Sequence, residues 1–233
     1  SALSGQYTLL LSATDTIGAN TTARVTVTAS NGGSATGTIS AGTPSMIAMP
    51  LHFSNAAPET VFGTGREYKV LRWDPEASDD VYLQKYRHIS AVEPGKAFWL
   101  IAYASDVPYV ATGTPVDTTQ SYSVAVKSGW NQIAVPFDID FIWGNVNIKT
   151  STATLTVSAA AAAGVISSSF FEYSPVTLSF AMHNSGETMS ARAGYFIRAY
   201  TDCELVFDPL MAMSAPAARI IRPRTDYMIR ISA

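Results

Sequence analysis

The sequence has few of the residues that most catalytic and metal sites require. Its 233 residues include one cysteine and three histidines, and 14% of them are charged. The single cysteine, Cys203, excludes an internal disulfide, and its apolar neighbourhood without a nearby histidine favours a buried side chain over a nucleophile. His52, His88 and His183 belong to no metal-binding spacing, and no phosphate-binding loop or serine-nucleophile motif is present. We therefore expect a protein that is not an enzyme and that needs no cofactor.

Positive charge and long apolar runs are also scarce. Lys and Arg number 15 against 18 Asp and Glu, and the basic residues are scattered, so we expect no nucleic-acid partner. No run of 18 apolar residues occurs, which predicts no membrane span. The first residues, SALSGQYTLLL, do not resemble a signal peptide. If the protein is secreted or displayed on a cell surface, we expect its signal to lie outside this sequence.

The residues that are abundant favour strands and turns. Thr, Ser, Val, Ala, Gly and aromatic residues dominate, and 47% of the chain is hydrophobic, which is enough for a core. The sequence therefore predicts an all-β fold.

Three short stretches occur twice, in the same order. "MIAMPL" is matched by "QIAVPF", "VLRWDP" by "FFEYSP", and "AFWLIAY" by "GYFIRAY". Each pair keeps its pattern of aliphatic, aromatic and proline residues, although the loops between the stretches differ in length. Such order indicates an internal repeat. The matched stretches are residues 46–51 and 132–137, residues 70–75 and 170–175, and residues 97–103 and 194–200.

The repeat predicts two tandem, pseudo-symmetric antiparallel β units, residues 31–120 and 121–212, each with one short helix. A β unit with an uncovered apolar face is stable only when something packs on it, so we expect the two units to pack around a pseudo-twofold axis and cover each other, in a β-sandwich. Residues 98–102 alternate with apolar side chains on both faces, as a central strand does. We expect four repeat-matched rings to be core: Trp73, Trp99, Tyr173 and Phe196.

The motifs "SGWNQIAVPF", "VLRWDP" and "VEPGKAFWLIAY" together resemble the duplicated β-rich module of large exported bacterial surface proteins. That module has a Gly-Trp-Asn-x-Ile-x-x-Pro signature and a Pro-Gly-Lys-x-aromatic-Trp signature. The resemblance covers roughly residues 35–210, and it implies an architecture and an extracellular location but no catalytic residues. The first unit departs from it, with Thr43 and Pro44 where the second has Gly129 and Trp130.

Both ends of the sequence differ from the repeat. Residues 1–30 resemble the last two strands of an immunoglobulin-like domain of the PKD or cadherin-like type, with a turn at residues 15–20. A hairpin alone is marginally stable, so we expect it to dock on its own β module or to form a dimer with the same hairpin of a second molecule. "NGGSATG", residues 31–37, predicts a flexible joint, and residues 213–233 predict a linker and the first strand of a following segment.

Four aromatic residues are candidates for a glycan-binding platform: Trp130, Trp143, Tyr82 and Tyr86. The alternative is that they fill the β core. Trp143 has no counterpart in the first unit, which favours an exposed ring.

Four carboxylates lie close together in a predicted hairpin loop. Their spacing is not that of an EF-hand, and an acidic loop is commonly only solvated, but such oxygens can also hold a structural Ca²⁺. The four residues are Asp74, Glu76, Asp79 and Asp80.

The function expected from the sequence is that of a non-catalytic structural or adhesive module in a modular secreted or cell-surface bacterial protein. Its partner would be a glycan or another surface protein. The alternative is a carbohydrate-binding accessory module of a secreted hydrolase.

Overall fold

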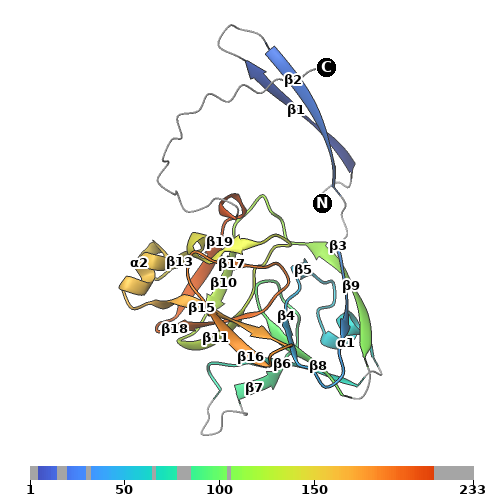
Figure 1. Cartoon of the computed structure of the whole chain (residues 1–233), viewed down its shortest axis with the longest axis vertical. Coiled ribbons are helices and arrows are strands. Elements are labelled where there is room, and N and C mark those ends of the chain that lie inside the picture. Colours follow the sequence, from blue (N-terminus) through green and yellow to red (C-terminus); the bar gives the residue numbers. More distant parts are fainter. Residues whose placement is uncertain are drawn as a thin grey trace.

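The structure is a computed structural model that describes residues 33–64, 67–77, 85–103 and 106–212, together with the backbone of residues 5–14 and 20–29. Within these ranges the chain is β-dominated, with small antiparallel sheets, and it contains no helix long and apolar enough to cross a membrane. The prediction of an all-β fold is confirmed at this level. Figure 1 shows the arrangement of the sheets and helices.

Residues 33–115, the first half, form two sheets. The first has the order β3-β9-β5, and the second has the order β4-β8-β6-β7. These strands are β3 (Gly33–Ile39), β4 (Ser45–Ile47), β5 (Leu51–His52), β6 (Tyr68–Trp73), β7 (Tyr86–His88), β8 (Phe98–Ala102) and β9 (Val107–Pro115), and the helix of this half is α1 (Pro58–Phe62).

Residues 122–212, the second half, form three sheets. Two have four strands, in the orders β10-β19-β13-β14 and β11-β18-β15-β16, and β12 pairs with β17. The strands are β10 (Tyr122–Val126), β11 (Gly129–Ile133), β12 (Phe141–Ile142), β13 (Asn147–Lys149), β14 (Thr154–Thr156), β15 (Ile166–Ser174), β16 (Ser179–His183), β17 (Thr188–Met189), β18 (Tyr195–Ala199) and β19 (Cys203–Phe207). The helices are α2 (Val157–Ala162) and the 3₁₀ turns η2 (Trp143–Asn145) and η3 (Pro209–Met211).

The matched stretches of the sequence occupy equivalent places in the two halves. In one sheet Ile47 lies opposite Phe98, and in the other Ile133 lies opposite Tyr195. The next strand repeats the agreement, since the pairs Leu71–Trp99 and Phe171–Phe196 are equivalent too. Each half also has one short α-helix, as the sequence predicts.

The halves do not lie one after the other as separate bodies, nor do they form a sandwich. The main sheets are arranged like the four blades of a propeller, which corrects the prediction of tandem sandwich-like units. The reason is an exchange of backbone hydrogen bonds between the halves. The Ala48 N–H donates to the Arg192 carbonyl at 2.9 Å, and the Ala134 N–H donates to the Gly95 carbonyl at 3.0 Å.

Three clusters of buried side chains fill the spaces between the sheets. One lies within each half, and the third joins the sheet of β4 and β8 to the sheet of β11 and β18. Strand β8 contributes to two of them, because Phe98 and Leu100 belong to the first-half cluster and Trp99 to the joining cluster. The prediction of a central strand with two apolar faces is confirmed.

Residues 33–37 of the predicted flexible joint are part of a strand, which corrects that prediction. Strand β3 pairs along its whole length with β9. Its glycines serve close packing, because a Cβ at Gly37 would meet the hydroxyl of Tyr109 at 2.5 Å and its ring at 2.7 Å. Ser30, Asn31, Gly32 and the predicted strand within residues 213–233 lie outside the described residues.

The N-terminal strands β1 (Gly5–Thr14) and β2 (Asn20–Ala29) pair antiparallel, as the predicted hairpin requires. They form a two-stranded sheet of their own. Most of the predicted turn between them, residues 15–19, lies outside the described residues.

Candidate functional site

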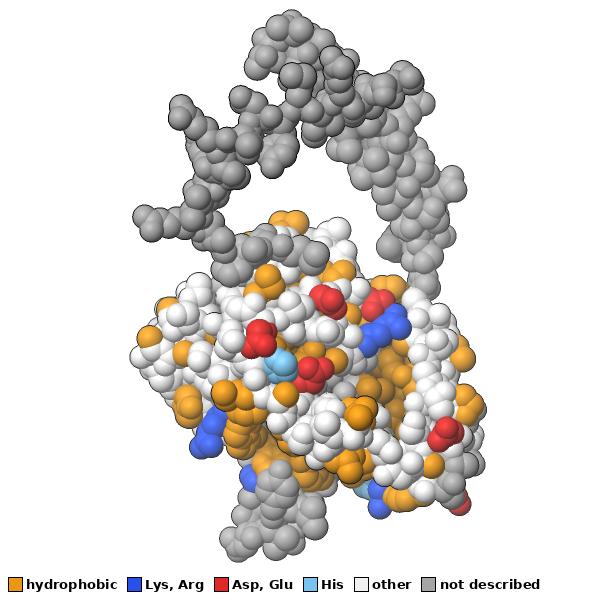
Figure 2. All heavy atoms as spheres, in the orientation of Figure 1, with side chains coloured by type: hydrophobic (Ala, Val, Ile, Leu, Met, Phe, Trp, Pro, Cys, Tyr) orange, Lys and Arg blue, Asp and Glu red, His pale blue; other side chains and the backbone are white. Residues whose placement is uncertain are grey.

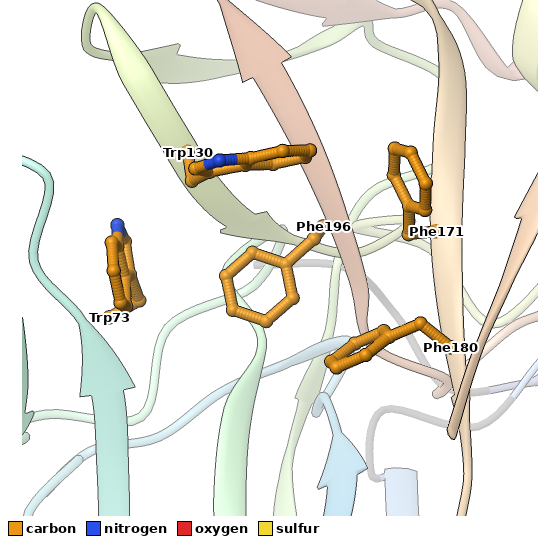
Figure 3. A pocket seen from close by; sticks show the side chains of 5 residues that line it. All are labelled: Trp73, Trp130, Phe171, Phe180 and Phe196. Atoms are coloured by element: carbon orange, nitrogen blue, oxygen red, sulfur yellow. The ribbon is translucent and has the colours of Figure 1, made fainter. Parts of the chain in front are cut away.

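Five aromatic side chains line a recess of about 310 Å³ where the two halves meet. Figure 3 shows Phe196 in the middle of the group, with the other four rings around it. We call this site the aromatic recess, and its lining residues are Trp73, Trp130, Phe171, Phe180 and Phe196.

Strand alternation explains why these rings meet. Four of them stand on one face of the sheet β11-β18-β15-β16, where Phe171 lies directly opposite Phe196. Successive residues of a strand point to opposite faces, so the neighbours Phe170 and Tyr195 enter the core of the second half instead. The fifth ring, Trp73, comes from β6 of the first half. The complete lining therefore requires both halves.

The rings hold one another in edge-to-face contacts. The Trp130 and Phe171 centroids are 5.4 Å apart with planes at 76°, and the Phe180 and Phe196 centroids are 5.7 Å apart at 70°. Trp73 packs on Phe196 in the same way, at 6.2 Å and 83°. Such contacts are favourable beyond simple burial, and they restrict the rotamers of the rings. The apolar lining is therefore largely preformed.

Buried polar contacts join the strands that carry Trp73 and Trp130. Gln132 is buried between the halves, and its side-chain carbonyl accepts a hydrogen bond from the Trp73 backbone N–H. Its amide nitrogen lies 3.3 Å from the Met46 sulfur. A buried amide is tolerated when it is hydrogen-bonded, and here it ties the backbone of β6 to β11.

Two cations lie over rings of the recess. The Arg198 guanidinium is 5.6 Å from the Trp130 ring centroid and 5.7 Å from that of Tyr200. The Lys85 ammonium is 5.4 Å from the Trp73 ring. No carboxylate of the described residues forms an ion pair with Arg198, whereas Arg192 pairs with Asp138 at 2.6 Å. The arrangement suits a ligand with an apolar group beside a negative charge.

The structure divides the predicted aromatic candidates. Trp130 lines the recess, and Tyr86 packs against Trp73 at its border, with centroids 5.3 Å apart. Trp143 is completely buried, which corrects the prediction of an exposed ring. Its indole N–H donates to the Ser168 carbonyl at 3.0 Å, so the polar atom is satisfied inside the core. Tyr82 lies outside the described residues.

The rings predicted as core have two roles. Trp73, Trp99 and Phe196 are buried, as predicted, whereas Tyr173 is only partly buried beside them. Trp73 and Phe196 also form walls of the recess. Phe171 and Phe180 were not singled out from the sequence. The available signal was the alternation of Phe171 with Tyr173, followed by Phe180 and Met182 in the next strand.

The predicted calcium loop is only partly described. The Asp74 carboxylate accepts a hydrogen bond from the Glu76 N–H at 2.9 Å, and Glu76 forms an ion pair with Lys127 at 3.2 Å. Asp79 and Asp80 lie outside the described residues. The part of the chain that the structure describes holds no group of three His, Cys, Asp or Glu able to bind a metal ion.

The cysteine is buried, and one histidine has two carboxylate partners. Burial, together with the nearby Asp202 charge, raises the pKa of Cys203 to about 11, so the thiolate is scarce at neutral pH. His183 lies between two carboxylates, with Nδ1 3.0 Å from Glu187 and Nε2 3.3 Å from Glu172. His183 is the last residue of β16 and Cys203 is the first residue of β19 in another sheet, and neither lines the recess.

Comparisons with known proteins do not assign this site. No family model, no curated protein and no solved structure matches the chain.

Proposed function

We propose that this chain is a non-catalytic binding module with a structural or adhesive role in a modular secreted or cell-surface bacterial protein. The observation that carries the proposal is the aromatic recess, with the guanidinium of Arg198 over its Trp130 ring and no ion pair to it from the described carboxylates. A preformed apolar hollow beside a charge is the usual form of an anchor site for a partner. The extracellular location is supported by the resemblance of the motifs around Trp130 and Trp99 to bacterial surface modules.

The chemistry of the lining favours a protein partner. All five lining side chains are aromatic, and their only polar side-chain atoms are two indole nitrogens. An apolar side chain needs nothing more than such a lining, whereas sugar hydroxyls taken out of water require hydrogen-bond partners. We infer that the ligand is a protein segment with an aromatic or aliphatic side chain and a carboxylate that reaches Arg198.

A glycan is the second candidate, and one observation favours it. Trp130 is only half-buried, so part of its indole is open to solvent, as in platforms that stack on sugar rings. An acidic sugar could also place its carboxylate on Arg198. This would correspond to a carbohydrate-binding accessory module.

The test is a binding screen of the parent chain against immobilised extracellular proteins and against a glycan array. Trp130→Ala should abolish binding, because it opens the recess and removes the ring beneath Arg198. Tyr103→Ala is the matched control, since Tyr103 is an exposed aromatic residue of the first half that does not line the recess. Binding that survives Trp130→Ala would exclude the recess as the site, and binding to glycans alone would favour the second candidate.

A further inference from the structure

Strand β16 is an uncovered edge with apolar side chains. It is the last strand of the sheet β11-β18-β15-β16, and its outer side pairs with no described strand. Two of its five residues are large, apolar and exposed, with Phe180 48% and Met182 68% accessible. The turn before it exposes Val176 at 90% and Leu178 at 64%. Figure 2 shows hydrophobic side chains on the surface in this part of the molecule.

The equivalent edge of the first half is protected. Strand β7 ends the sheet β4-β8-β6-β7 as β16 ends its own, but it has three residues, and its middle residue is Arg87. Short, charged edge strands prevent pairing with other chains, because the charge would be buried against the added strand. From Ser179 to Met182, β16 carries no charged residue and no proline. The contrast indicates that β16 lacks the features that keep an edge strand from pairing with another chain.

The sequence of β16 is complementary to itself. In an antiparallel pair centred on Ala181, the two copies of Ala181 face each other at the axis, and Phe180 of one copy faces Met182 of the other. Apolar residues then meet apolar residues on one side of the sheet, and the small Ala181 side chain permits close approach on the other. A two-fold axis produces such pairing, because the same patch serves both copies.

We propose that two copies of this chain form a homodimer by antiparallel pairing of β16 about Ala181. The two sheets become one continuous sheet, and the exposed ladder groups of both edges are satisfied. Residues directly opposite in an antiparallel pair lie on the same face, so both aromatic recesses open on the same side of the dimer. The inference does not depend on what the recess binds.

The test measures the mass of the full chain by light scattering over a range of concentrations. We expect the parent to approach twice its monomer mass of 24.9 kDa. Met182→Lys should give the monomer mass at the same concentrations, because it places a charge in the new contact. Val110→Lys is the matched control: Val110 is 67% exposed on β9, an interior strand of its sheet, and the variant should remain a dimer.

Disulfide formation tests the register. Ala181→Cys should give a covalent dimer under mild oxidation, because the two copies of residue 181 face each other within disulfide distance. Ser179→Cys should not, because Ser179 of one copy faces His183 of the other. The native Cys203 is buried and present in both variants. A monomeric parent overturns the proposal, and so does a dimer that Met182→Lys leaves intact. A dimer that only Ser179→Cys cross-links overturns the register about Ala181.

Discussion

One sheet in each half has the same strand order and register, but four of the five rings of the aromatic recess stand on the sheet of the second half, and the first half contributes Trp73. Position by position, the rings Trp130 and Phe171 of the second half correspond to Pro44 and Leu71 of the first. Arg198, whose guanidinium lies over Trp130, corresponds to Ile101. The backbone plan is therefore kept in both halves, while the exposed face has changed in one. A scaffold duplicated in this way can keep one copy for packing and use the other for binding.

The same comparison extends to turns within each half and to the turns that join the two halves. In the first half the Ala41 N–H donates to Asp106, and in the second the Ser128 N–H donates to Asp202, both at 2.9 Å. Gly95 and Arg192, whose carbonyls accept the exchanged hydrogen bonds, both have a positive φ, of 75° and 65°. The turn contacts are therefore similar in the two halves, whereas the side chains that face solvent differ.

The largest expected effect comes from removing equivalent buried rings. Trp99→Ala and Phe196→Ala should each lower the free energy of unfolding by about 3–5 kcal/mol, because both rings are buried in the cluster that joins the halves. Chemical denaturation measures the change, with Tyr103→Ala as an exposed control expected within about 0.5 kcal/mol of the parent. If one of the two buried-ring variants is as stable as the parent, the halves do not contribute equally to their interface.

Gly95 and Arg192 test whether the two turns are equivalent. Gly95→Ala should destabilise, because a left-handed residue other than glycine costs about 1–2 kcal/mol and the new Cβ would collide with Val124. Arg192→Gly removes the same strain but loses an exposed ion pair with Asp138 worth about 0.2–1 kcal/mol, so its net effect should be small. Thermal unfolding of the two variants measures the asymmetry. If Gly95→Ala is as stable as the parent, the turn does not require glycine at residue 95.

Gln132 is the polar exception at the interface, since its counterpart in the first half is Met46. Gln132→Met would make the two positions alike and remove the acceptor of the Trp73 N–H, at a cost of about 1–3 kcal/mol. Urea denaturation measures the loss. Gln132→Glu is the control, since it retains an oxygen acceptor, and it should be less destabilising than Gln132→Met at a pH where the carboxyl is protonated. If Gln132→Met is stabilising, the buried amide has no structural role.

The smallest effect is a pH dependence expected in the second half. The hydrogen bond from the Ser128 N–H, aided by Lys127, lowers the pKa of Asp202 below its ordinary 3.8. The unfolded chain binds this proton more readily, so the stabilisation is present above about pH 4 and is lost as the pH falls through the lower folded pKa. Asp202→Asn should therefore lower the melting temperature at neutral pH, and the difference from the parent should shrink at about pH 3.

Asp106→Asn is the matched variant in the first half. Asp106 accepts from the Ala41 N–H but has no lysine partner among the described residues, so its loss should matter less at neutral pH. If the melting difference for Asp202→Asn stays constant from neutral to acid pH, Asp202 does not stabilise the fold through its charge.

Much of the architecture could be predicted because it depends on local pattern. The alternation of residues 98–102 predicted a strand with two covered faces, and it has them. The repeat predicted one short helix in each unit, and that of the second unit is α2, which ends near Gly164 with a positive φ of 68°. The predicted joint failed because a glycine-rich stretch can be flexible or can pack unusually close to a neighbour. Only the presence of Tyr109 beside Gly37 decides between the two.

The sequence by itself determined that the chain is β-dominated, that two stretches of it share one strand plan, and which faces of those strands are apolar. The tertiary structure alone decided what covers each face. Trp143 is in the core, where Phe170 packs against it, whereas Trp130 is only partly buried in the wall of the recess. Strand periodicity specifies the direction of a side chain, whereas burial depends on neighbours that are distant in sequence, and the aromatic recess consists of such neighbours.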